Sequence, residues 1–272
     1  MKYPKLLRIN QPLIRVLARA PIFLGLDYDG TLTPIIRDPK KAVIPAKTKK
    51  IIEKLRDSGA CKIAVVSGRS IRQLNSLTGL KKITLVGNHG YEINEPGKRA
   101  WIHPEVRRAR KTVSKIRPHI KKIVGQFPGA KLEDKALILA IHYRSLSGKR
   151  VGPLKAKIQE KIRKLKLARG LQWGYGKKVW ELRPRIHWHK GAALRRMLKK
   201  GKTSYGSIFY FGDDITDEFA FRSLGGKAVT VKVGMNKKSL ARYAVPTYKQ
   251  VQKFLHQLSF ILNDRERNKV EL

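Results

Sequence analysis

The sequence predicts an α/β protein with a parallel-sheet core and an inserted α+β unit. Short apolar runs alternate with amphipathic helical stretches near both ends of the chain, whereas the middle follows a repeated order of helix, strand, strand. Acid-rich motifs stand where the apolar runs stop. With 272 residues, 42% of them hydrophobic, the chain is long enough for a core domain that carries a smaller insert.

The predicted core strands are apolar through most of their length, as strands covered on both faces should be. They are IFLGLD (22–27), KIAVVS (62–67), ITLVG (83–87), SIFYFG (207–212) and AVTVKV (228–233). A helix over 47–59 places Ile51, Ile52 and Leu55 on one face and stops at a glycine. Further helices are expected at 189–199, 216–224 and 248–262. Alternation of this kind favours a parallel sheet.

The insert is predicted from a change of pattern after residue 103. Helices are expected at 104–124 and 153–167, and strands at 130–134, 136–144, 171–176 and 178–183. This αββαββ order indicates a cap over 104–186 within a core formed by 1–103 and 187–272. Three aromatic residues, Trp173, Tyr175 and Trp180, are expected in the hydrophobic core of the insert.

The composition is strongly basic, with 61 Lys and Arg against 19 Asp and Glu and a net charge of +42. Such a charge predicts non-specific attraction of polyanions, although its spread along the whole chain also fits a general basic bias. The single Cys61 excludes an intramolecular disulfide and a cysteine-ligated zinc site. No apolar run approaches the ~18 residues of a membrane helix. We expect a cytoplasmic monomer that is not bound to membranes.

Four polar motifs follow the predicted strands. They are Asp27-Tyr28-Asp29-Gly30-Thr31, Ser67-Gly68-Arg69, Gly87-Asn88-His89-Gly90 and Gly212-Asp213-Asp214-Ile215-Thr216-Asp217-Glu218. Ligands of open α/β sheets bind beyond the carboxyl ends of the strands, so these loops should converge. The first and last motifs hold six of the 19 acids in 12 residues. A single aspartate often caps a helix, and Asp217 is expected to do so, but this concentration indicates a site.

Clustered buried carboxylates repel one another unless a cation offsets their charge. Oxygen ligands without cysteines favour Mg²⁺. Asp27 and Asp29 are two residues apart, so one can attack phosphorus while the other handles protons. Backbone N–H groups near Gly30 and the Ser67 hydroxyl are expected to hold phosphoryl oxygens. Lys190, at the start of a predicted helix, supplies a cation.

The order DxDGT, Ser, Lys and GDDxxD resembles the haloacid-dehalogenase-like phosphatases, which have a Rossmann-like core. The fuller strings LDYDGTLTP, VVSGR, GNHGYE, PGAKLEDK, VWELRP, HKG and GDDITDE resemble the trehalose-6-phosphate phosphatases within that superfamily. The resemblance covers about residues 20–250 and implies that the αββαββ insert is a substrate-reading cap.

The resemblance also implies roles for individual residues. Asp27 would be the nucleophile that forms an aspartyl-phosphate, and Asp29 the acid and then the base. Ser67 and Lys190 would bind the phosphoryl group. Mg²⁺ would be held by Asp27, the Asp29 carbonyl and Asp213, with Asp214 and Asp217 ligating or orienting. In the cap, the sugar-binding positions would be Glu133, Lys135 and Glu181.

Several alternatives stay open from the sequence. Arg69, Asn88 and His89 are candidates for substrate or phosphate contacts. Trehalose 6-phosphate is the expected substrate, but the core motifs also suit related sugar phosphates such as sucrose phosphate or mannosyl-phosphoglycerate. A basic nucleic-acid-binding protein on a phosphatase scaffold is the alternative from a different class, and the intact motifs disfavour it.

Overall fold

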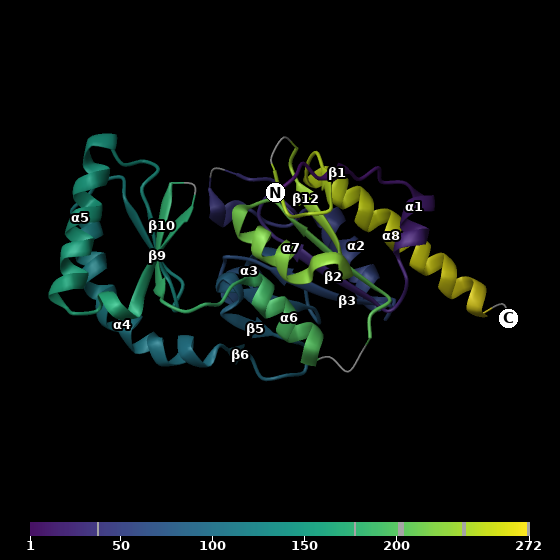
Figure 1. Ribbon diagram of the computed structural model, residues 1–272, viewed down its shortest axis with the longest axis horizontal. Coiled ribbons are helices and arrows are strands. Elements are labelled where there is room, and N and C mark those ends of the chain that lie inside the picture. Colours follow the sequence, from purple (N-terminus) through teal and green to yellow (C-terminus); the bar gives the residue numbers. More distant parts are fainter. Residues whose placement is uncertain (37, 177, 201–203, 236–237, 271–272) are drawn as a thin grey trace. The chain divides into compact units, whose positions relative to one another are not determined.

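The structure, a computed structural model, describes residues 1–36, 38–176, 178–200, 204–235 and 238–270. It divides into two compact units, Met1–Trp101 with Trp188–Leu272, and Ile102–His187. We call them the core unit and the cap unit (Figure 1). The first is built on a large, mostly parallel sheet and the second on a small antiparallel sheet, which confirms the predicted fold class.

The core sheet holds nine strands within the described residues, in the order β1-β13-β12-β11-β2-β3-β4-β5-β6. Their bounds are β1 (Lys5–Leu6), β2 (Ile22–Asp27), β3 (Cys61–Val66), β4 (Thr84–Gly87), β5 (Glu92–Asn94), β6 (Trp101–Ile102), β11 (Ser207–Gly212), β12 (Val229–Val233) and β13 (Tyr243–Val245). Pairing is parallel from β1 across to β4 and antiparallel between β4 and β5. The strand β2 therefore lies in the middle of the sheet, between β11 and β3.

Helices cover both faces of this sheet (Figure 1). On one face lie α1 (Gln11–Leu17), α2 (Ala46–Asp57), α3 (Ile71–Thr78) and α8 (Tyr248–Val270), and on the other α6 (Lys190–Lys200) and α7 (Glu218–Leu224). In β2, Leu24 and Leu26 pack on the α2 and α8 side, whereas Phe23 packs on the α6 and α7 side. Because side chains alternate along a strand, Gly25 and Asp27 share the α6 and α7 side.

The cap sheet is antiparallel throughout, in the order β7-β8-β10-β9. Its elements are α4 (Pro104–Gly125), β7 (Lys131–Asp134), β8 (Leu139–His142), α5 (Gly148–Lys164), β9 (Leu171–Gly176) and β10 (Val179–Pro184). Ile116 of α4 and Ile158 of α5 are fully buried against Leu139, Ile141 and other apolar residues of one sheet face. The cap unit therefore has a hydrophobic core of its own. Short 3₁₀ helices complete the chain at η1 (Pro39–Lys41), η2 (Asn88–Gly90), η3 (Ala168–Gly170), η4 (Ile215–Asp217) and η5 (Gly225–Lys227).

Some predicted element limits were wrong for local reasons. The strand expected from 136 begins at Leu139, because the Asp134 carboxylate accepts the Ala136 N–H at 2.8 Å and Ala136 has a positive φ of 65°. The helix expected from 153 begins at Gly148, six residues before Leu154, the first residue of its apolar stripe. The expectation of a core position for Tyr175 was also wrong, since this residue is 64% exposed.

Two features of the described residues concern location and reactivity. None of the helices is both long and apolar enough to cross a membrane. Cys61, the single cysteine, lies buried at the start of β3, and burial raises the pKa of its thiol to about 12.

Candidate active site

One lysine joins two aspartates at the carboxyl edge of the core sheet. Asp27 ends β2 and is 4% exposed, and Lys190 begins α6 and is 3% exposed. The Lys190 Nζ donates to Asp27 Oδ1 at 2.7 Å and to Asp217 Oδ1 at 2.8 Å. His189 Nδ1 accepts the Ala192 N–H at 3.1 Å, which caps the first turn of α6 and fixes where Lys190 stands. A single ammonium thus serves two carboxylates from distant parts of the chain.

Asp217 is fixed by several donors besides Lys190. Its Oδ2 accepts the Asp214 N–H at 3.0 Å, and the Asp214 side chain accepts the Asp217 N–H, so the two form a capping box at η4. The hydroxyl of Tyr210, on β11, donates to Asp217 Oδ1 at 2.7 Å. Asp217 stands at the N-cap of α7, as expected, but its side chain makes no cap hydrogen bond to that helix and serves the η4 capping box instead. Its fully buried carboxylate is held from both oxygens.

Asp213 lies directly against the turn that follows β2. Gly30 has a positive φ of 79°, and a Cβ at this position would stand 2.2 Å from Asp213 Oδ2. Only glycine meets both demands. The Gly30 N–H donates to the Thr33 carbonyl at 2.8 Å, so this one N–H is engaged within the turn.

The electrostatics of the cluster reflect crowding of like charges. Burial, followed by the charges of Asp217 and Asp213, raises the pKa of Asp27 well above its ordinary value, and the Lys190 ammonium opposes this. Burial together with Asp217 and Asp214 raises the pKa of Asp213 to about 6. Burial opposes the charge of Lys190, but Asp217 and Asp27 more than offset it and raise the pKa of the ammonium. The negative charge therefore exceeds what Lys190 balances.

These three aspartates have the arrangement of a metal site. Asp27, Asp213 and Asp217 each offer one carboxylate oxygen, and the three oxygens lie within 4.8 Å of one another. Hard oxygen donors with two charges left over after Lys190 fit a hard divalent cation. The Asp214 side chain belongs to the η4 capping box beside this cluster. The predicted metal-binding roles of the Asp29 carbonyl and of Asp214 stay predictions.

Asp29 is held by Arg69 in a two-pronged ion pair. The Arg69 Nε and Nη2 donate to the two oxygens of Asp29 at 2.7 and 2.6 Å. The arginine side chain is 9% exposed, whereas that of Asp29 is 40% exposed. A fork of this kind binds an ionised carboxylate and orients it. The structure thus places Arg69 on Asp29.

The loops after β3 and β4 are tied together beside this pair. Ser67 is buried, and its hydroxyl oxygen accepts the Arg69 N–H at 3.2 Å. The Asn88 N–H donates to the Arg69 carbonyl at 2.7 Å, and the His89 N–H donates to the Ser67 carbonyl at 3.0 Å. Asn88 is fully buried, and its amide donates to Glu92 Oε1 at 2.8 Å. Asn88 and His89 are thereby placed as supports of the Ser67 loop.

The three predicted sugar-binding residues lie together in the cap unit. Glu133 on β7 and Glu181 on β10 both pair with Ala140 on β8, so their side chains share one face of the sheet. Lys135 Nζ donates to Glu181 Oε1 at 2.9 Å, and both side chains are 11% exposed. Glu133 Oε2 lies 2.8 Å from His142 Nε2. Charged groups thus line the face opposite the cap's hydrophobic core.

Residues 25–253 match the trehalose-phosphatase family, which is most of the chain. The chain belongs to this family. It is 30% identical over 273 residues to probable trehalose-phosphate phosphatase I of Arabidopsis thaliana, a match that covers 95% of this chain and 73% of the relative. Membership of this family confirms the predicted phosphatase class. Every motif described above lies within the matched residues.

Solved structures of relatives have the same fold. A trehalose-6-phosphate phosphatase related protein superposes with a TM-score of 0.78 at 27% identity, covering 89% of this chain and 99% of that one. The C-terminal domain of Candida albicans trehalose-6-phosphate phosphatase superposes with a TM-score of 0.75 at 25% identity, covering 95% and 98%. These likenesses extend through the core and cap units of this trehalose-phosphatase family member.

Neither the role of Tyr210 nor the reason for Gly25 was predicted from the sequence. The two residues are register partners on β11 and β2, and a Cβ at Gly25 would stand 2.7 Å from Tyr210 Cδ2. The glycine lets the fully buried Tyr210 ring lie across β2 with its hydroxyl on Asp217. A glycine inside a buried strand is a recognised sign of such a close approach, and it could have been read from FLGLD.

The pair Gly25 and Tyr210 can be tested by a double-mutant cycle. Gly25→Ala should lower the free energy of unfolding by about 1–3 kcal/mol, because the new methyl group overlaps the ring. In a Tyr210→Val background the same change should cost much less. Urea unfolding followed by circular dichroism measures both costs. Equal costs in the two backgrounds would show that Tyr210 does not explain the glycine.

The raised pKa of Asp213 predicts a pH-dependent stability for the metal-free protein. A carboxyl whose pKa rises on folding, here from 3.8 to about 6, stabilises the fold fully below the lower value and loses that contribution as pH rises through the higher one. The free energy of unfolding, measured with a chelator present, should therefore fall from about pH 4 to pH 6. Asp213→Asn should flatten this fall. An unchanged slope in that variant would assign the dependence to other groups.

Proposed function

We propose that this chain hydrolyses trehalose 6-phosphate to trehalose and phosphate with Asp27 as nucleophile and Mg²⁺ as cofactor. The observation that carries the proposal is the buried Asp27 carboxylate held by Lys190 beside Asp213 and Asp217. The ammonium favours the ionised form of Asp27, which is the nucleophilic one. The names of two Arabidopsis thaliana relatives, probable trehalose-phosphate phosphatase I and trehalose-phosphate phosphatase B, support the choice of substrate.

Asp27, Asp213 and the backbone carbonyl of Asp29 are the proposed metal ligands. Asp217, whose two oxygens already accept protein hydrogen bonds, orients Lys190 and completes the charge of the site. When bound, Mg²⁺ would offset the repulsion among these carboxylates and the charge of the phosphoryl group.

The reaction proceeds in two displacements. An Asp27 oxygen forms a bond to phosphorus while the bond from phosphorus to the sugar oxygen breaks, and the leaving oxygen takes a proton from Asp29. Water then gives a proton back to Asp29 and attacks phosphorus, which releases phosphate and regenerates the Asp27 carboxylate. Lys190 and the Ser67 hydroxyl bind phosphoryl oxygens in both steps.

The ion pair with Arg69 orients Asp29 for these steps. The guanidinium donates to both carboxylate oxygens, at 2.7 and 2.6 Å, and so fixes the side chain that is proposed to exchange protons.

In the cap unit, Glu133, Lys135 and Glu181 are the proposed readers of sugar hydroxyls. Carboxylates accept hydrogen bonds and ammonium groups donate them, so a disaccharide can satisfy all three side chains. A ligand without matching hydroxyls would leave buried charges poorly paired. This is how the cap would separate trehalose 6-phosphate from other phosphate esters.

The nucleophile is tested by Asp27→Asn. An amide is a poor nucleophile, so turnover of trehalose 6-phosphate should fall by more than about 10⁴-fold, as removal of a nucleophile does in other enzymes. Phosphate release by the purified variant, with circular dichroism to establish folding, measures this. The surface change Asp57→Asn, at a side chain 64% exposed, is the matched control and should leave turnover unchanged. Substantial turnover by a folded Asp27→Asn protein would remove the mechanism.

The substrate is tested by a panel containing trehalose 6-phosphate, sucrose phosphate, mannosyl-phosphoglycerate and p-nitrophenyl phosphate. We expect the highest kcat/KM for the first. Preference for another sugar phosphate would replace the substrate and keep the mechanism.

The cap's role is tested by Lys135→Ala on the same panel. Loss of the ammonium should raise the KM for trehalose 6-phosphate about ten-fold or more and spare p-nitrophenyl phosphate, which has no sugar to read. Lys149→Ala, at an exposed residue of α5, removes the same charge from the cap unit and should change neither value. Equal losses on both substrates would show that Lys135 does not read the sugar.

A further inference from the structure

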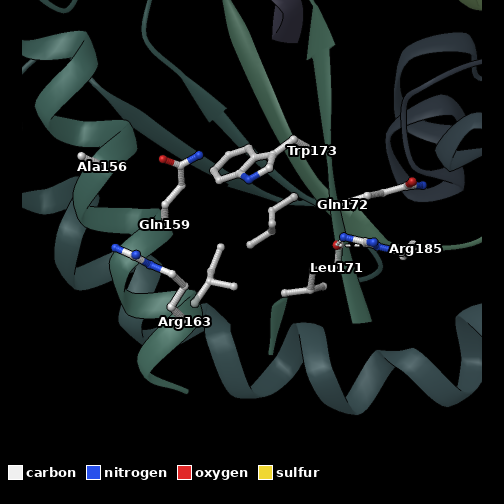
Figure 2. A pocket seen from close by; sticks show the side chains of 9 residues that line it. Ala156, Gln159, Arg163, Leu171, Gln172, Trp173 and Arg185 are labelled. Carbon is white, nitrogen blue, oxygen red and sulfur yellow. Dashed lines mark hydrogen bonds between the residues drawn. The ribbon is translucent and has the colours of Figure 1, made fainter. Parts of the chain in front are cut away.

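A cavity of about 530 Å³ lies within the cap unit, between α5 and the strands β9 and β10 (Figure 2). Its lining includes none of the residues assigned above to chemistry or to sugar binding. The volume falls in the range of sites that hold small organic molecules. The cavity is therefore a second candidate site.

The floor of the cavity is apolar and one wall is aromatic. Ile162, Leu171 and Leu182 line it and are themselves buried at 5% exposure or less. Trp173, on the outer strand β9, is half-buried and packs edge-to-face on Trp180 at 6.2 Å. Figure 2 shows the Trp173 ring on the side of Gln159. A planar apolar group has a surface on which to stack.

Polar groups line the cavity from both sides. Gln159 and Arg163 are four residues apart on α5 and so share one face of that helix, while Gln172 and Arg185 come from the strand side (Figure 2). The Gln172 amide points away from Trp173 (Figure 2) and donates to the Pro184 carbonyl at 3.1 Å. The Arg163 guanidinium is exposed and makes no hydrogen bond within the described residues. Arg185 Nε and Nη2 donate to the Leu171 carbonyl at 3.3 and 3.2 Å, which orients that guanidinium.

These groups have distinct chemical preferences. A glutamine amide offers a donor and an acceptor together, as the edge of a nucleobase does. An arginine fork matches the oxygens of a phosphate. The cap unit, residues 102–187, carries 24 Lys and Arg against 5 Asp and Glu, so an anionic ligand is attracted to it.

We propose that this cavity binds a nucleoside phosphate. The base stacks on Trp173 and meets the amide of Gln159, and the phosphate binds Arg163. The proposal stands on the cap unit alone and does not depend on the reaction assigned to Asp27.

The test is ¹⁹F NMR of the full chain carrying 5-fluorotryptophan, with AMP as the probe. The chain has four tryptophans, and Trp173→Phe identifies the signal of Trp173. AMP should shift that signal saturably. Adenosine and inorganic phosphate, tested separately, should each bind about ten-fold more weakly or worse, because each lacks one half of the contacts.

Variants distinguish AMP binding at this cavity from general attraction of AMP to a basic surface. Arg163→Gln should weaken AMP binding about ten-fold, and Trp173→Leu, read by calorimetry, should do the same. Arg108→Gln, at an exposed arginine of α4 that does not line the cavity, removes the same charge and should have no effect. The proposal is overturned if AMP leaves the Trp173 signal unmoved, if inorganic phosphate binds as well as AMP, or if the two arginine variants weaken binding equally.

Discussion

The catalytic half of the molecule depends on one ammonium group shared by Asp27 and Asp217. Burying a carboxylate without a charged partner costs folding free energy, and here two carboxylates share the Lys190 ammonium. The partner can reach both only because α6 starts where it does, β2 and β11 are adjacent, and η4 turns Asp217 back toward the sheet. Removing this lysine would leave three neighbouring carboxylates with their repulsion unopposed.

Under the proposed function, the core unit carries out the reaction and the cap unit recognises the sugar. In the core unit, the groups suited to phosphorus chemistry come from loops at the carboxyl edge of a sheet that is rigidly packed on both faces. In the cap unit, one sheet face carries the hydrophobic core and the other carries paired charges. Because each unit has its own core, the recognition face can change in sequence without disturbing the site around Lys190.

Much of this arrangement could be predicted from sequence patterns. The long, fully apolar runs identified β2 and β11 to the residue, since burial on both faces leaves little ambiguity. The short strands β1 and β13, at one side of the sheet, have only two and three residues and gave no pattern. The motif aspartates could be placed at one edge, but their partners could not. Neither the Arg69 fork on Asp29 nor the Tyr210 hydroxyl on Asp217 follows from spacing, because both contacts join residues through the register of neighbouring strands and loops.

The chemistry of Cys61 determines how motion in this molecule can be observed. Its thiol is buried and has a pKa of about 12, so almost none of it is thiolate at neutral pH. Thiol-labelling reagents should therefore not react with it. Cysteines added on the surface, one in each unit, can then carry a donor and an acceptor dye without a cysteine-free parent protein. The natural sequence is in this respect ready for single-molecule distance measurements between the two units during turnover.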